Sequence, residues 1–194
     1  EYRLSALVIG ISDRKKIITG TRITEGDVII GLHTEGISSI SYPFVKVILD
    51  RRPDIAYAKI DGEKVFMDEL IKPNASYVKA VSELISDNLI HGAFCINKSL
   101  FNRRCYETIP KGLGAEIDVT AIPVPALFRY LYDLNMMDRE CFLDDFSLGI
   151  GMLLAVPIEH CDRAVKIIKK YHQCWRVGTI KKDEEHPDAR VWLK

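Results

Sequence analysis

Two short polar runs in this sequence carry residue types that bind charged ligands. Asn102, Arg103 and Arg104 follow one another, and their amide and guanidinium groups can hold an anion through several hydrogen bonds. Asp144 and Asp145 are adjacent carboxylates, a ligand type that magnesium accepts. Neighbouring charges on loops are also commonly solvated. Exposed loop charges therefore remain the alternative interpretation of both runs.

Cysteine and histidine side chains offer a second kind of chemistry, metal binding. His160, Cys161, His172 and Cys174 lie near one another in the sequence. On a helix the adjacent His160 and Cys161 would point about 100° apart, so they could not easily face one metal ion. The five cysteines include no Cys-x-x-Cys pair, and their number is odd. We predict no metal site, inert thiols and a reducing, cytoplasmic location.

The overall composition argues against two classes of partner. Lysine plus arginine and aspartate plus glutamate each number 27, so the formal net charge is zero, and we expect neither nucleic acid nor an anionic membrane as a partner. No apolar run approaches the roughly 20 residues that span a bilayer. With 194 residues and 47% hydrophobic content the chain can bury its own core, and we predict one domain over residues 1–194.

Short apolar runs predict the strands that position the polar groups. Runs that are rich in β-branched residues are typical of buried strands. We expect strands at 7–11, 28–32, 90–96, 115–122, 148–156, 175–180 and 190–193, with 183–188 as a polar hairpin loop between the last two. Residues 97–114 carry no clear pattern.

Apolar residues at helical spacing predict the helices between these strands. We expect helices to begin after Ser41 and after Asn74 or Ser76, which are suitable N-cap residues, and again within 127–134 and 158–171. Several successive strands have no helix between them, which argues against a simple doubly wound sheet. We therefore predict an α/β chain of the α+β type, in which helices pack on a mixed β-sheet.

The framework of strands, glycines and prolines resembles a known family. The pieces that carry the resemblance are at 1–6, 26–32, 77–79, 109–110, 149–152 and 175–178. In order and spacing they are similar to the C-terminal half of aminoimidazole ribonucleotide synthetase, which is also called phosphoribosylformylglycinamidine cyclo-ligase. The resemblance runs over essentially the whole chain and implies the fold of that half. It also implies that the family's N-terminal nucleotide-binding domain is absent from this chain.

The resemblance brings expectations about cofactors and partners. The family closes the imidazole ring of its product with ATP and magnesium, and its N-terminal domain supplies much of the nucleotide and metal binding. We therefore expect no cofactor for this chain alone, and ATP with magnesium if a full-length protein is active. The missing N-terminal domain is the implied partner, and full-length members of the family commonly form homodimers.

The first loop that carries site residues in the family is altered here. Ser38 and Ile40 stand at the positions of the family's histidine and asparagine. A side chain that could carry a proton and an amide that could orient a substrate are therefore both replaced. Ser39 matches the family and remains a candidate for binding substrate or phosphate.

Two further loops depart from the family pattern in the same way. Asn102, Arg103 and Arg104 replace three glycines, whose backbone N–H groups would approach a phosphate. These three side chains remain candidates for binding substrate or phosphate. Ser147 replaces an asparagine just before the glycine-containing strand. All three site loops are thus altered, whereas the framework around them is retained.

The altered loops leave three hypotheses for function. We favour a diverged, non-catalytic domain of the synthetase type, a pseudoenzyme candidate that serves as a structural, regulatory or interaction module of a purine-biosynthesis protein. The alternative is the C-terminal half of an active ATP-dependent cyclo-ligase or a related synthetase. The third hypothesis is an α/β domain that shares only the fold. Whether the chain belongs to an enzyme stays open on the sequence alone.

Overall fold

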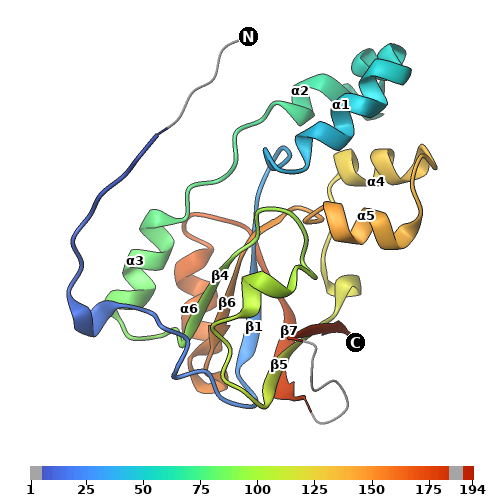
Figure 1. Cartoon of the computed structure of the whole chain (residues 1–194). Coiled ribbons are helices and arrows are strands. Elements are labelled where there is room, and N and C mark those ends of the chain that lie inside the picture. The colour runs from blue at the N-terminus through green and yellow to red at the C-terminus, as the bar shows by residue number, and fades with distance from the viewer. Residues whose placement is uncertain (1–5, 184–189) are drawn as a thin grey trace.

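A six-stranded sheet forms the centre of the structure, a computed structural model that describes residues 6–183 and 190–194 (Figure 1). The strand order is β4-β6-β1-β7-β5-β8. All neighbouring strands are antiparallel except β5 and β8, which run parallel, so the predicted mixed sheet is confirmed. The strands are β1 (Val28–His33), β4 (Gly92–Cys95), β5 (Leu113–Ile117), β6 (Ile150–Val156), β7 (Cys174–Lys182) and β8 (Val191–Leu193).

Helices surround this sheet on one face and at one end. The α-helices in the described part of the chain are α1 (Tyr42–Arg51), α2 (Phe66–Leu70), α3 (Val78–Ser86), α4 (Ala126–Asp133), α5 (Arg139–Asp145) and α6 (Cys161–Ile168). Short 3₁₀ turns are η1 (Arg14–Lys16), η2 (Pro53–Tyr57), η3 (Arg103–Tyr106), η4 (Val119–Ala121) and η5 (Ile158–His160). Within the described residues, every helix is too short or too polar to cross a membrane.

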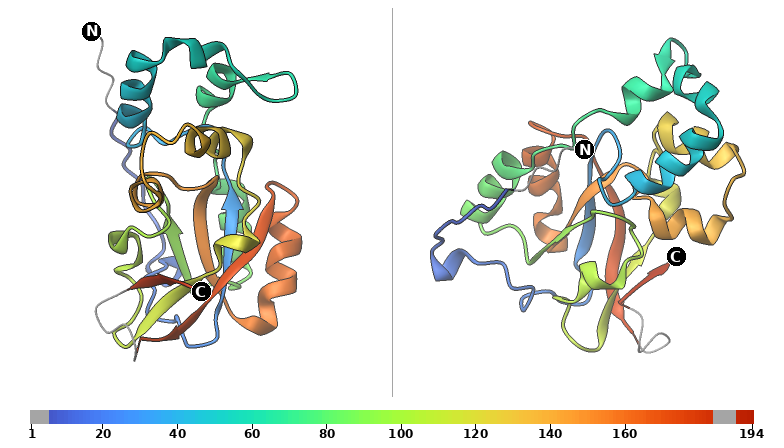
Figure 2. Two further views of the ribbon diagram at one scale, coloured as in Figure 1. Left: turned by 90° about the vertical axis from the view of Figure 1, so that its right-hand side faces the viewer. Right: turned by 45° about the horizontal axis from the view of Figure 1, so that its top comes forward.

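The helices fall into two groups with different places on the sheet. α3 and α6 lie side by side and cover one face of it. Figure 2 shows α1, α2, α4 and α5 gathered beyond one end of the sheet, together with a small hairpin of β2 (Lys59–Asp61) and β3 (Lys64–Val65).

Both faces of the sheet are buried, which explains the continuous apolar runs of its central strands. On β1, Ile29 packs in the core that includes α1, α2, α4 and α5, whereas Ile30 packs in the core under α3 and α6. Leu153 and Leu154 on β6 divide between the same two cores, and all four side chains are fully buried. Apolar and polar residues would alternate only if one face met solvent. The predictions of buried strands in these two regions are therefore confirmed.

The predicted strand at 7–11 is wrong. Leu7 and Ile9 are each 86% exposed and Ile11 is fully exposed, and the segment belongs to neither sheet. It runs as an extended chain along the outside of the molecule near α3 (Figure 1). A strand needs a neighbour for its backbone N–H and carbonyl groups. No described segment supplies that neighbour here.

The predicted hairpin between the last two strands is also wrong. β5 lies between β7 and β8, because Ala115 pairs antiparallel with Ile180 and parallel with Val191. Residues 184–188 of the expected hairpin loop lie outside the described residues. Strands that follow one another along a chain usually pair. Here both edges of β7 are already occupied, by β1 and β5, so β8 joins the outer edge of β5.

Two helices begin differently from the predicted pattern. Ser41 occupies the N-cap position of α1 as predicted, but its hydroxyl donates to the carbonyl of Asp145 instead of capping the helix. α3 has Tyr77 at its N-cap position, so the prediction of Asn74 or Ser76 as its cap is wrong. In both cases a residue at the helix start makes a contact with a distant segment, which local capping preferences do not describe.

Candidate functional site

Two adjoining pockets lie where β1 and β4 end and β6 begins. We call the first the hydroxyl pocket; its volume is about 200 Å³, and its lining residues are Thr34, Ser38, Ser39, Asn74, Ala75, Tyr77, Cys95, Ile96, Asn97, Ser147 and Gly151. We call the second the basic pocket; its volume is about 440 Å³, and its lining residues are Ile40, Ala93, Phe94, Cys95, Asn97, Lys98, Asn102, Arg104, Cys105 and Thr108. Cys95 and Asn97 belong to both walls, and the two pockets together are called the groove.

The structure brings most of the predicted site residues to this groove. Those in the hydroxyl pocket are Ser38, Ser39 and Ser147, and those in the basic pocket are Ile40, Asn102 and Arg104. Arg103 is exposed and lines neither pocket. The loops come from distant parts of the sequence, and they meet because β4, β6 and β1 are neighbours in the sheet.

The hydroxyl pocket offers neutral hydrogen-bonding groups that are partly engaged already. Ser38 donates its hydroxyl to the carbonyl of Asn97 and accepts the N–H of Ile40 at 3.1 Å. Tyr77 donates its phenol to the carbonyl of His33 at 3.0 Å, and burial raises the pKa of Tyr77 to about 12, so the phenol stays protonated at neutral pH. None of the described lining residues is charged at neutral pH. This wall can orient a polar ligand but offers no general base.

Gly151 has no side chain, and this lets Tyr77 and Thr34 lie close to β6 at the hydroxyl pocket. A Cβ atom at this position would lie 2.3 Å from the phenol oxygen of Tyr77 and 3.0 Å from the Cβ of Thr34. The glycine on β6 therefore lets the start of α3 approach the sheet closely. One glycine of the sequence framework is thus explained by packing against Tyr77.

Lys98 in the wall of the basic pocket forms an ion pair with a nearly buried carboxylate. Lys98 Nζ lies 2.5 Å from Asp145 Oδ1 and 5.7 Å from the ring centre of Phe44. The residue Asp145 is 8% exposed, so its charge is held inside the protein by Lys98. The adjacent carboxylates Asp144 and Asp145 therefore do not act as a free pair. Over residues 6–183 and 190–194, no three histidine, cysteine, aspartate or glutamate side chains are grouped to hold a metal ion.

The run that we predicted to replace three glycines of the family begins the short turn η3. Asn102 is its N-cap and accepts the N–H of Arg104 at 3.2 Å. Tyr106 is fully buried at the end of the turn, and its hydroxyl donates to the carbonyl of Leu100. Because the N–H of Arg104 is engaged, the turn offers an anion the guanidinium of Arg104 rather than a row of free backbone N–H groups.

Sequence reasoning missed several polar residues of the groove. Asn97 and Lys98 directly follow the predicted strand at 90–96, and polar residues on a loop just after a strand are a usual sign of a site. This signal was present in the sequence, but Asn97 and Lys98 lie in the stretch 97–114, which has no clear pattern of strand or helix. Asn74 and Tyr77 reach the groove only because α3 packs against the sheet, which no local pattern in the sequence indicates.

The sheet and its helices define a class of fold that solved structures share. Thiamine-monophosphate kinase from Stenotrophomonas maltophilia K279a is similar with a TM-score of 0.57 and 14% identity, over 90% of this chain and 52% of that protein. Hydrogenase maturation protein HypE is similar with a TM-score of 0.59 and 19% identity, over 90% of this chain and 51% of HypE. At these identities the likeness shows the fold alone.

The sequence relatives establish the family within that class. Residues 24–187 match the family described as AIR synthase related protein, C-terminal domain, and the chain belongs to this family. It is 32% identical over 179 residues to a phosphoribosylformylglycinamidine cyclo-ligase from Bacillus cereus strain G9842, and 31% identical over 179 residues to one from Bacillus thuringiensis strain Al Hakam. Each match covers 91% of this chain and 52% of the relative. The chain thus spans about half the length of the curated relatives it matches, and the resemblance in its framework is confirmed.

Proposed function

We propose that this chain is a diverged C-terminal domain of the AIR synthase type that does not catalyse ring closure and serves as a binding or structural module in purine biosynthesis. The observation that carries the proposal is the groove. Ser38 and Ile40 stand where the resemblance implies a histidine and an asparagine, and the capped turn η3 stands where it implies three glycines. Losing one donor to a transition state costs about 10²–10³ in rate, so these combined changes remove most of the catalytic machinery.

The alternative function is that of the C-terminal half of an active ATP-dependent cyclo-ligase. One feature of the groove favours it. Arg104 lines the basic pocket and has no carboxylate partner among the described residues, so its guanidinium is available for a phosphate. The 32% identity to the Bacillus cereus cyclo-ligase points the same way. In this alternative, a further domain supplies the rest of the site for ATP and magnesium.

The proposal includes a setting and a partner. The described cysteines are all free thiols, which agrees with a reducing cytoplasm. The partner is a domain that corresponds to the other half of the relatives' length, and the two-domain protein would assemble as a homodimer. Neither nucleic acid nor a membrane is part of the proposal.

Turnover of a chimaeric enzyme tests the two functions. A chimaera should be made in which this chain replaces the C-terminal half of the Bacillus cereus cyclo-ligase, and the native enzyme is the positive control. With formylglycinamidine ribonucleotide, ATP and magnesium, we expect ADP release at least about 10²-fold below that of the native enzyme. The thermal melting curve of the chimaera establishes that both halves are folded.

Restoring the loops sharpens this test. A chimaera that also carries Ser38→His, Ile40→Asn and glycines in place of Asn102, Arg103 and Arg104 should regain turnover if only the site is degraded. Turnover by the unrestored chimaera near the native rate would contradict the first function. If Arg104→Gln then abolished that turnover, the second function would be supported.

A further inference from the structure

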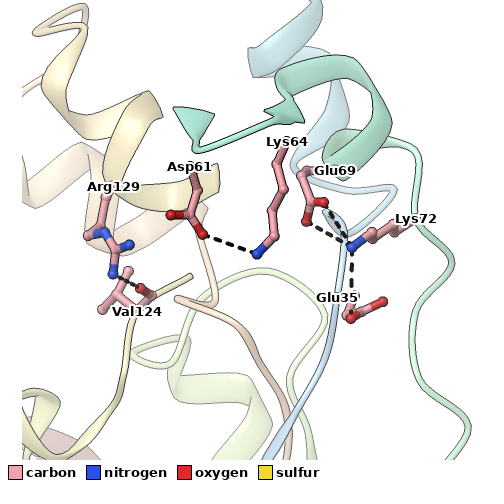
Figure 3. Close-up of polar contacts among 7 residues, drawn as sticks. All are labelled: Glu35, Asp61, Lys64, Glu69, Lys72, Val124 and Arg129. Carbon is pink, nitrogen blue, oxygen red and sulfur yellow. Dashed lines mark hydrogen bonds and ion pairs between the residues drawn. The ribbon is translucent and has the colours of Figure 1, made fainter. Parts of the chain in front are cut away.

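A third pocket, of about 290 Å³, lies beside the end of β1 and shares only Thr34 with the groove. It is called the charged pocket because its wall carries six charged side chains: Glu35, Asp61, Lys64, Glu69, Lys72 and Arg129. They come from the loop after β1, the β2–β3 hairpin, the end of α2 and the helix α4 (Figure 3). None of them belongs to the groove, so this pocket is a separate candidate site.

Backbone packing shapes the charged pocket before any ligand arrives. Gly36 has a φ of +66°, and a Cβ atom there would lie 2.1 Å from the carbonyl oxygen of Lys72. On the opposite side Pro123 and Pro125 restrict the backbone, and Pro125 packs so closely on Gly149 that a Cβ there would lie 2.5 Å away. A preformed wall lowers the entropic cost of binding a small molecule.

One end of this pocket carries more carboxylate than its lysine can neutralise. Lys72 Nζ lies 2.9 Å from Glu69 and 3.9 Å from Glu35, so two carboxylates share one ammonium group. Lys64 and Asp61 form a separate pair at 3.1 Å. The excess negative charge therefore lies beside Glu35, the more distant and more exposed partner of Lys72.

The other end carries a cation without a carboxylate partner. Arg129 donates to the carbonyl of Val124 at 2.8 Å and makes no ion pair within the described part of the chain. Figure 3 shows Arg129 and Glu35 on opposite sides of the Asp61–Lys64 pair. The pocket is thus dipolar. One side has a guanidinium without a carboxylate partner among the described residues, and the other has an excess carboxylate.

Aromatic side chains also line the charged pocket. Phe128 and Trp175 line the pocket, and His33 contacts Trp175 edge-on with ring centres 5.7 Å apart. Nδ1 of His33 is buried near the backbone of Gly149.

We propose that the charged pocket binds a small zwitterion of the amino-acid class, with its carboxylate on Arg129, its ammonium group near Glu35 and its side chain against Trp175. The wall carries three carboxylates and three cations, which suits a ligand with charges of both signs, and the volume of the pocket is at the lower end for small-molecule sites. A nucleotide, which is a polyanion, is therefore a poorer fit. This inference goes beyond the proposed function and does not depend on it, because it uses no residue of the catalytic loops.

Tryptophan fluorescence can test the proposal on this chain directly. The sequence has two tryptophans, so Trp192→Phe leaves Trp175 in the pocket wall as the sole reporter. The standard amino acids are titrated one by one at neutral pH. The amino acid that binds best is then compared with its decarboxylated amine and its deaminated acid. We expect saturable binding at millimolar concentration or below, weakened about tenfold or more by loss of either charge.

Matched variants locate the binding. Arg129→Gln and Glu35→Gln replace exposed side chains, and each should weaken binding of the amino acid about tenfold. Arg163→Gln, which removes an exposed arginine paired with Asp87 on the far helices, is the control and should leave binding unchanged. Melting curves show whether each variant is folded. The proposal is overturned if no amino acid binds, if either truncated compound binds as well as the amino acid, or if neither pocket variant weakens binding.

Discussion

The hydroxyl groups near the strand ends donate to backbone carbonyls of distant segments. Ser38 bonds to the segment after β4, and Ser41 bonds to the end of α5, 104 positions away in the sequence. Tyr77 does the same toward the end of β1. A hydroxyl becomes a nucleophile only when a base takes its proton, and a carbonyl oxygen does not do so. At the scale of single residues these groups therefore hold loops together.

His33 leads to a prediction about pH. Burial is the main cause that lowers the pKa of its imidazole from the usual 6.5, and His172 and Lys72 act in the same direction while Glu35 opposes them. The unfolded chain therefore binds this proton more readily than the folded chain. The contribution of neutral His33 to stability is full above about pH 6.5 and is lost as the pH falls below that value.

Urea unfolding at neutral and mildly acidic pH measures this effect. The native protein should lose more of its free energy of unfolding on acidification than His33→Gln, which has no imidazole to titrate. An equal loss in the two proteins would show that His33 does not couple protonation to folding.

The boundaries of several elements depend on contacts that local propensity does not describe. β5 ends at Ile117 instead of continuing to residue 122, because Asp118 accepts the N–H of Thr120 and begins η4. Residues 7–11 have the composition of a strand, but no strand among the described residues lies beside them. Composition thus indicated which segments could be extended, and the available hydrogen-bond partners decided which became strands.

Substitutions in two apolar runs should differ sharply in how much they lower the free energy of unfolding. Ile29→Ala in fully buried β1 should lower the free energy of unfolding by about 2–5 kcal/mol, because it leaves a cavity in the core. Ile9→Ala, at a side chain that is 86% exposed, should change it by less than about 0.5 kcal/mol. Chemical denaturation of the two variants gives both values. A large loss for Ile9→Ala would mean that this segment packs against the folded part.

At the scale of the whole molecule, the sheet order determines which parts of the chain meet. The central strands β6, β1 and β7 are each flanked on both edges, and both faces of the sheet are covered. The groove and the charged pocket both lie at the end of β1, where loops from distant parts of the sequence gather. The last strand closes the sheet on the far side of β5 and contributes to neither pocket.

Hydrogen exchange can test the position of β8. The N–H of Ala115 donates to the carbonyl of Arg190 at 2.9 Å, whereas the N–H of Ile180 donates to the carbonyl of Asp27 at 2.8 Å. Deleting residues 190–194 should therefore speed exchange at Ala115 and leave Ile180 protected. Faster exchange along β7 with Ala115 unchanged would instead support the hairpin that the sequence alone suggested.

The sequence by itself determined the central strands, the approximate positions of the helices and the family. These features follow from local constraints: a strand buried on both faces must be continuously apolar, and glycines and prolines mark turns and close packing. The resemblance also led to the prediction that Ser38, Ile40 and Asn102 stand where the family has other residues. These inferences needed only the identity and order of residues.

The tertiary structure alone decided where β8 pairs, which hydroxyls are engaged and how the pockets are charged. The Lys98–Asp145 pair joins residues that are far apart in the chain, and Arg129 and Glu35 line one pocket although they too are far apart in the sequence. No short stretch of the sequence contains both partners of such a contact, so the contact forms only when the folded sheet brings their segments together. For that physical reason the fold could be predicted from the sequence, whereas the charged pocket could not.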